Sequence, residues 1–190
     1  MVLALSLLLI IVQFAFLVIV AIGTATVLAG AISITLDVPY VPTPSRYYRI
    51  IEKALQIKAR DTMYELGSGT GGLLLALAKK HPDTAFIGIE LNPLLFYFSR
   101  VRKRLVGNPT NVVFRRENFF NTDFSRASKV YGYLLDTVMP RLLEKLQRES
   151  HGLRFASRAF KFESKEPAET ITLSRIPGSH GEHMVYVYEL

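Results

Sequence analysis

The residues best suited to chemistry lie together in a glycine-rich segment in the first half of the chain. The segment ELGSGTGG begins at Glu65, and its glycines at 67, 69 and 72 formally satisfy the spacing G-x-G-x-x-G. Glycines allow a backbone to turn tightly and to approach a ligand closely. A second carboxylate, Glu90, ends the next apolar run, where it could accept hydrogen bonds from ribose hydroxyls. This spacing indicates a site for a nucleoside-containing cofactor.

Two cofactors suit such a turn, and Glu65 discriminates between them. A nicotinamide enzyme normally has an apolar residue two positions before the first glycine, so a carboxylate there would have no task. S-adenosylmethionine carries an ammonium group and a sulfonium group, which a carboxylate favours. A P-loop is excluded, because no Gly-Lys-Ser/Thr follows the turn. We therefore predict S-adenosylmethionine rather than a dinucleotide, with Glu90 on the ribose in either case.

The composition excludes several other chemistries. The chain has 190 residues, a formal net charge of +7 and no Cys, so disulfides, thiolate metal sites and cysteine nucleophiles are ruled out. His180 and His183 are close in sequence, but no third ligand stands at a useful spacing. No metal site is predicted.

Strands and helices alternate around the glycine turn and must position it. Strands are expected at 62–66, 84–91, 112–115 and 129–135, and helices at 73–80, 93–106 and 138–148. The strands are continuous apolar runs, as in a parallel sheet covered by helices. We predict an α/β fold with a Rossmann-like, doubly wound and mostly parallel sheet.

The alternation stops after Gly152. Three further strands are expected at 153–160, 170–175 and 184–189, with no helix between them and a turn at 177–181. This pattern predicts an antiparallel finish to the sheet.

Ahead of the glycine turn, residues 37–45 (DVPYVPTPS) contain three prolines in six residues and are expected to be extended, with a helix following to residue 59. On composition alone, the proline-rich segment is a stiff linker.

The first 36 residues contain no charged side chain, and the first charge is Asp37. Such a run exceeds the roughly 20 apolar residues needed to cross a bilayer. We predict one transmembrane helix at about residues 3–28, followed by an interfacial stretch; a cleaved signal peptide is the rival, although no basic residue precedes the apolar run. Arg46, Arg49 and Lys53 follow the segment, so the positive-inside rule places the remainder in the cytoplasm. The expected organisation is an anchor at 1–36, a leading segment at 37–60 and the main domain at 61–190.

The glycine turn carries a resemblance to a known family. Together with the acidic strand end IELNP around Glu90, it resembles the class I (seven-β-strand) S-adenosylmethionine-dependent methyltransferases. A narrower likeness rests on the proline-rich segment, on NFF at 118–120, on DFS at 123–125 and on YLL at 133–135. With the apolar N-terminus, these are similar to the small membrane-anchored protein-lysine methyltransferases, which include the enzymes acting on the ATP synthase c subunit and the adenine nucleotide translocase, and their prokaryotic relatives. The chain departs from that group at Thr70, where an Asp is more usual, and at Asp136, where a proline is.

The resemblance implies a set of site residues. The expected cofactor-binding residues are Glu65, Gly67, Ser68, Gly69, Thr70, Gly71, Glu90, Leu91 and Asn118. In that group the proline-rich segment covers the site, so a lid over cofactor and substrate is expected from Pro39, Tyr40, Val41, Pro42 and Thr43. Asn118 takes the position that faces the adenine, although its type also suits a turn.

The resemblance also implies an activity. We expect a membrane-anchored methyltransferase acting on a lysine of a membrane or membrane-associated protein, with the bilayer held through residues 1–36. A lipid, a quinone-like molecule or an RNA is the alternative acceptor, and a non-catalytic S-adenosylmethionine-binding membrane protein is the alternative of another class. Nucleic acid is disfavoured, because the Asn-Pro-Pro-Tyr type of motif is missing. Methyl transfer to an amine requires an uncharged amine and accurate alignment rather than one particular side chain, so no general base and no oligomeric state are predicted.

Overall fold

The computed structural model describes residues 2–35, 40–173 and 184–190, and the chain forms two compact units, Met1–Tyr40 and Val41–Leu190. The predicted boundaries at residues 36 and 60 stay predictions. The predicted turn at 177–181 lies outside the described residues.

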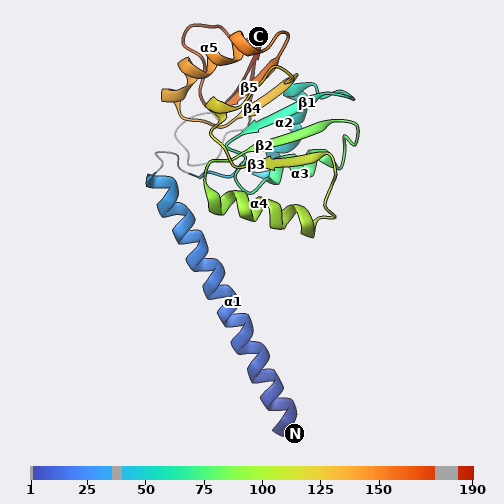
Figure 1. Ribbon diagram of the computed structural model, residues 1–190, viewed down its shortest axis with the longest axis vertical. Helices are drawn as coiled ribbons and strands as arrows, with labels where there is room; N and C mark the ends of the chain where they lie inside the picture. Colours follow the sequence, from blue (N-terminus) through green and yellow to red (C-terminus); the bar gives the residue numbers. More distant parts are fainter. Residues whose placement is uncertain (1, 36–39, 174–183) are drawn as a thin grey trace. The chain divides into compact units, whose positions relative to one another are not determined.

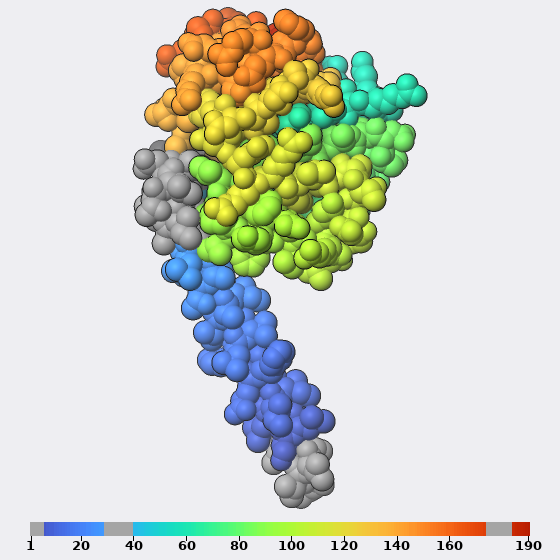
Figure 2. Space-filling view, in the orientation of Figure 1, coloured from blue at the N-terminus to red at the C-terminus, as the bar shows by residue number. Residues whose placement is uncertain are grey.

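The first unit is one long helix, α1 (Val2–Thr35). Its segment Ser6–Leu28 is long and apolar enough to cross a membrane, a test that a signal sequence near an N-terminus also passes. The side chains described along it are exposed, apart from the partly buried Ala25 (Figure 2). Thr24 and Thr26 donate their hydroxyls to carbonyls of the preceding turn, at Val20 (3.0 Å) and Ile22 (2.8 Å), so these polar groups are satisfied within the helix.

The helix continues to Thr35, where we expected an interfacial stretch after about residue 28. The residues from 29 to 35 are small or β-branched, and none is a proline. Such residues weaken a helix only slightly, whereas a proline would end it. A helix already formed over its preceding turns therefore extends through them.

The second unit is built on a seven-stranded sheet with the order β3-β2-β1-β4-β5-β7-β6 (Figure 1). Strands β1 to β5 are parallel, and β7 runs antiparallel to both β5 and β6. This confirms the predicted Rossmann-like, mostly parallel sheet with an antiparallel finish. The strands are β1 (Thr62–Leu66), β2 (Ala85–Ile89), β3 (Val112–Arg115), β4 (Lys129–Gly132), β5 (Arg154–Arg158), β6 (Glu169–Thr172) and β7 (Met184–Glu189).

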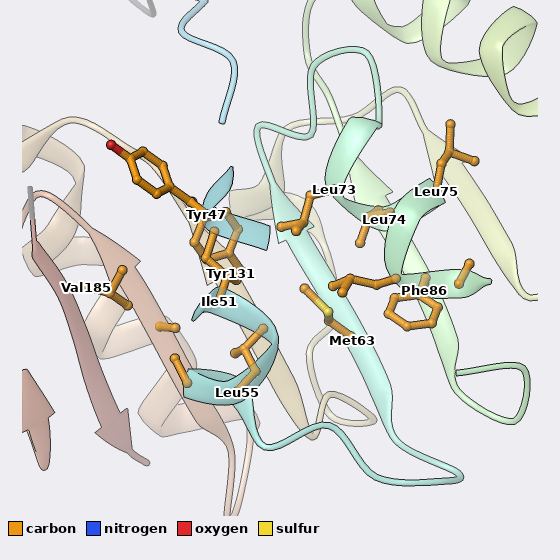
Figure 3. Close-up of a cluster of buried hydrophobic side chains, with 14 of the residues drawn as sticks. Tyr47, Ile51, Leu55, Met63, Leu73, Leu74, Leu75, Phe86, Tyr131 and Val185 are labelled. Atoms are coloured by element: carbon orange, nitrogen blue, oxygen red, sulfur yellow. The ribbon is translucent and has the colours of Figure 1, made fainter. Parts of the chain in front are cut away.

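Helices cover both faces of this sheet. On one face, α2 and α3 pack with side chains such as Met63 and Tyr131 into one buried cluster (Figure 3). On the other face, α5 packs with side chains such as Tyr64 and Phe155 into a second cluster. The helices are α2 (Tyr48–Leu55), α3 (Gly72–Ala78), α4 (Pro93–Leu105) and α5 (Met139–Glu149), with single 3-10 turns η1 (Ser45–Tyr47), η2 (Phe119–Asn121) and η3 (Asp136–Val138).

Most elements begin or end within a few residues of the prediction, and two of the differences are described here. The helix expected to reach residue 59 ends at Leu55, because Gln56 adopts a left-handed conformation (φ 50°) and bonds back to the Lys53 carbonyl at 3.1 Å. Strand β4 ends at Gly132 rather than at residue 135, and the chain then enters η3 at Asp136. Both differences shorten an element without moving the residues that face the site.

Candidate active site

The predicted site residues meet where the parallel strands end. The register pairs Glu65 of β1 with Gly88 of β2 on one side and with Tyr131 of β4 on the other. Paired residues share a face of the sheet, and side chains two positions apart along a strand do so as well. Glu65, Glu90 and Tyr131 therefore belong to the face that α2 and α3 cover, at the carboxyl edge where open α/β sheets bind their ligands.

Glu65 is a buried carboxylate, 5% exposed, whose Oε2 atom has no hydrogen-bond partner among the described residues. Burial raises its pKa well above the usual value, and the negative charge of Glu90 raises it further. A buried, unpartnered carboxylate oxygen is costly to keep and calls for an explanation. A cationic or hydrogen-bond-donating ligand group supplies one.

The glycine turn is shaped by positions that other residues would not tolerate. Gly67 and Gly71 have positive φ angles, 68° and 72°, which L side chains rarely adopt. A Cβ at Gly71 would stand 2.2 Å from the Phe114 ring of β3, and one at Gly88 would stand 2.6 Å from the same ring. The turn and the two strands beside it therefore pack around a single aromatic side chain.

Glu90 is fixed by the backbone on both sides of it. Its Oε2 accepts from the Gly69 N–H at 2.7 Å and its Oε1 from the Asn92 N–H at 2.8 Å. Burial raises its pKa, and these two bonds oppose that shift. Asn92 in turn caps α4 by accepting from the N–H groups of Leu94 and Leu95. Each carboxylate oxygen can accept more than one hydrogen bond, so Glu90 keeps capacity for hydroxyl donors.

The remaining predicted cofactor residues lie around this turn with different exposures. Ser68 is buried, and its Oγ has no partner among the described residues. Thr70 accepts from Arg102 Nη1 at 3.4 Å, and Leu91 is exposed directly after Glu90. Ser68 thus adds a second orphaned polar atom to the site of Glu65.

Asn118 has a local structural task. Its Oδ1 accepts from the Phe120 N–H at 2.9 Å and so caps η2, while the residue itself is exposed. An adenine contact at Asn118 remains a prediction. Two carboxylates in this part of the chain also have local partners: Glu117 accepts from Thr122 Oγ1 at 3.1 Å, and Asp136 accepts from the Thr137 N–H at 2.8 Å.

The predicted lid is described only in part. Pro39 lies outside the described residues, and Tyr40 belongs to the first unit. Val41 and Pro42 are exposed, whereas the Thr43 hydroxyl lies 3.2 Å from the hydroxyl of Tyr131. Thr43 thereby joins the carboxyl edge of the sheet beside the strand partner of Glu65.

Other side chains at this edge were not predicted as site residues from the sequence. Tyr131 is fully buried, and burial raises the pKa of its hydroxyl. The rings of Tyr133 and Tyr47 contact the buried Arg158, whose guanidinium carbon is 4.3 Å and 5.2 Å from their centroids. One signal was available: Arg154 and Arg158 stand four residues apart in one expected strand, which places both on one face.

These residues fit S-adenosylmethionine. The orphaned Glu65 oxygen can accept from its ammonium group, the glycine turn brings backbone close to the ligand, and Glu90 can accept from its ribose. Within residues 2–35, 40–173 and 184–190, no group of three or more His, Asp or Glu side chains could hold a metal ion.

Comparison with known proteins agrees with this fit. The family model for the ANTKMT methyltransferase domain matches residues 65–169. A protein-lysine N-methyltransferase of Saccharolobus islandicus is 32% identical over 157 residues, which are 80% of this chain and 92% of that protein. A lysine N-methyltransferase of Rattus norvegicus, named for the C subunit of ATP synthase, is 32% identical over 133 residues, 70% of this chain and 60% of that protein.

A solved structure also indicates a methyltransferase fold and the same cofactor. The RNA methyltransferase of Salinibacter ruber in complex with S-adenosyl-L-homocysteine is 28% identical, with a TM-score of 0.70, and the match covers 78% of this chain and 93% of that one. S-adenosyl-L-homocysteine is what S-adenosylmethionine becomes once its methyl group has been transferred. The cofactor is therefore S-adenosylmethionine, and the chain belongs to the ANTKMT methyltransferase domain family of the class I methyltransferases.

Proposed function

We propose that this chain methylates the side-chain amine of a lysine on a membrane or membrane-associated protein. The observation that carries the acceptor class is the match over 80% of the chain to a relative named as a protein-lysine N-methyltransferase. The rat relative acts, by its name, on the C subunit of ATP synthase, which supports a protein acceptor again. The chain spans only 60% of that relative, so its particular substrate does not enter the proposal.

The cofactor, when bound, supplies a methyl group on a positively charged sulfur. The residues of this chain have two tasks, one toward the cofactor and one toward the acceptor lysine. Glu65 and Glu90 hold the cofactor at its ammonium group and its ribose, which fixes the direction of the displacement. The buried Tyr131 and the half-buried Tyr133 lie at the neighbouring strand end, where a lysine would lose water and be favoured in its neutral form.

We further propose that α1 anchors the protein in a bilayer, with the second unit on the cytoplasmic side. Its apolar segment is long enough to span the hydrocarbon region, and the hydroxyls of Thr24 and Thr26 within that segment are satisfied internally. Basic side chains follow it, as at cytoplasmic ends of membrane helices. An anchor would raise the effective concentration of acceptors that share the membrane.

The acceptor class is tested by transfer of a tritiated methyl group. The full chain in detergent micelles is mixed with labelled S-adenosylmethionine and membranes from cells that lack this protein. We expect protease-sensitive label that acid hydrolysis releases as methyl-lysine. A Gly67→Arg variant, which places a bulky side chain at a positive φ in the turn, is the matched control and should transfer nothing.

Each other acceptor has a distinct outcome. Label that organic solvent extracts would assign a lipid or a quinone-like acceptor. Label released by ribonuclease would assign RNA, the acceptor named for the Salinibacter ruber protein. Either result contradicts a lysine acceptor.

A further inference from the structure

Arg158 ends β5 at the carboxyl edge of the sheet and is only 3% exposed. An arginine side chain stays charged at any physiological pH. Burying that charge is costly unless its N–H groups are paired. Among the described residues, the Nε and Nη1 atoms of Arg158 are buried and have no hydrogen-bond partner.

Its contacts do not satisfy those donors. The guanidinium group lies against the rings of Tyr133 and Tyr47, at 4.3 Å and 5.2 Å. Aromatic faces attract a cation, but they leave the in-plane N–H groups of the guanidinium without acceptors. The side chain is therefore positioned by aromatic contacts while its hydrogen bonds are left for another group.

Arg154 shows what a structural arginine looks like on the same face of the same strand. It donates through Nε to the Ala54 carbonyl at 2.6 Å and through Nη2 to Glu169 at 3.0 Å, and it pairs with Glu189 through Nη1. All three nitrogens have partners in the chain. The contrast indicates that the partner of Arg158 is a ligand.

The position of Arg158 relative to Glu65 limits which kinds of ligand could bind both side chains. Ala156 of β5 is in register with Tyr131 of β4, and Tyr131 is in register with Glu65 of β1. Neighbouring strands are about 4.8 Å apart and Arg158 lies two residues, about 6.6 Å, further along β5 than Ala156, so the backbones of Glu65 and Arg158 are roughly 12 Å apart on one face of the sheet. Their long side chains can therefore reach two groups of one small molecule. One site thus presents an unpartnered carboxylate oxygen and unpartnered guanidinium nitrogens.

A ligand that satisfies both must carry an ammonium and a carboxylate close together, as an α-amino acid does. The methionine part of S-adenosylmethionine is such a group. We propose that Arg158 binds the α-carboxylate of the cofactor while Glu65 binds its α-ammonium; the inference rests on the cofactor assignment and not on the identity of the acceptor. A carboxylate on the acceptor protein has the same chemistry, and the experiment separates the two sources.

The test measures binding by calorimetry on the full chain in detergent micelles. S-adenosylhomocysteine carries the carboxylate, and decarboxylated S-adenosylmethionine lacks it but keeps an amine. Arg158→Gln should weaken S-adenosylhomocysteine binding by about 10- to 100-fold, since a charge-assisted hydrogen-bonded pair is lost. It should change binding of the decarboxylated compound by less than about twofold, because no carboxylate is present to lose the pair.

Two controls accompany the variant. Arg148→Gln removes an exposed arginine on α5 and should bind both compounds as the unaltered chain does. Thermal unfolding should show that Arg158→Gln is at least as stable as the unaltered chain without ligand, because a buried unpaired charge has been removed.

Three results would overturn the proposal. Equal weakening of both compounds would show that Arg158 only supports the fold of the site. Unchanged S-adenosylhomocysteine binding with a raised KM for the methyl acceptor would assign the carboxylate to the acceptor instead. Unchanged binding with an unchanged KM would remove Arg158 from the site altogether.

Discussion

A buried carboxylate destabilises a folded chain unless something pairs with it, and at the scale of single residues Glu65 is in that position. The pKa of its carboxyl is raised by burial and by the charge of Glu90. Between the unfolded value of 4.5 and this raised value, the folded state holds a proton that the unfolded state has released. Stability without ligand therefore falls as the pH rises through that window. If Glu65 binds the cofactor's ammonium group as we propose, part of the folding free energy is given up to keep that site.

Replacing Glu65 by Gln tests this trade. The amide cannot ionise, so the ligand-free variant should be more stable than the unaltered chain at pH 8 and about equally stable near pH 4.5. A gain of about 1 kcal/mol raises Tm by about 2–4 °C in a domain of this size. Thermal unfolding of the full chain in detergent across this pH range measures the gain.

The same variant should lose most of its affinity for S-adenosylhomocysteine, because a neutral amide cannot pair with an ammonium group. Calorimetry at pH 8 checks the loss, and exposed Glu144 changed to Gln is the control. A Glu65→Gln chain that is less stable at pH 8, or that binds as before, would refute this account of the residue.

Part of the site could be predicted from the sequence because its residues are close together along the chain. Glu65 and the glycines stand within one short segment, and Glu90 ends the next strand. Arg158 and Phe114 could not be found in this way, because their importance depends on which strands are neighbours. Strand register brings Arg158 to the face of Glu65, and no local pattern in the chain encodes that register.

Among the elements, the glycine turn depends on how two neighbouring strands, β2 and β3, pack beside it. Phe114 of β3 fills the space beside Gly71 and Gly88, so the turn, β2 and β3 meet at one ring. Gly88 has an ordinary backbone conformation, and its lack of a side chain is therefore a requirement of space.

A Gly88→Ala variant should consequently lose about 1–3 kcal/mol of stability through overpacking. The added Cβ would stand 2.6 Å from Phe114 Cδ1 and 2.8 Å from Ser68 Oγ. Thermal unfolding measures the loss. The double variant with Phe114→Leu should recover part of it, because a smaller side chain leaves room for the methyl group. Two losses that simply add would show that the ring and the glycine do not interact.

The order and type of the elements were predictable, since apolar runs alternate with amphipathic helices in the way that parallel sheets require. The helix and strand ends were less so. Helix α2 ends at Leu55 because Gln56 adopts a left-handed backbone conformation. That conformation could not be predicted from the residue type, since glutamine rarely adopts it. Helix α1 passes residue 28 because residues 29 to 35 contain no proline that would end it.

At the scale of the whole molecule, the apolar helix α1 decides whether the protein is held in a membrane. If α1 spans a bilayer, the full chain should remain with membranes through washing at alkaline pH, which strips proteins held by surface charge. Changing Phe16 and Val20 to Lys should release it, since each lysine near a helix centre costs about 2.5–3.5 kcal/mol.

Membrane fractionation followed by detection of the chain measures this outcome. A lysine placed at exposed Gln147 on α5 is the control and should leave the chain in the membrane fraction. Release of the unaltered chain by the alkaline wash would contradict the proposed anchor.

The position of β7 between β5 and β6 has a consequence for the order in which the protein can be assembled during synthesis. Among the described strands, β6 pairs with β7 alone, although β7 is made after it, and the backbone of Leu190 bonds to that of Leu153 in both directions. The sheet therefore cannot be completed until β7 has left the ribosome, long after α1 has emerged. A chain interrupted before Met184 would present the unpaired edge of β5 and an unattached β6, which are templates for aggregation. If α1 is the membrane anchor that we propose, its insertion and the completion of the sheet by β7 are thus separated in time.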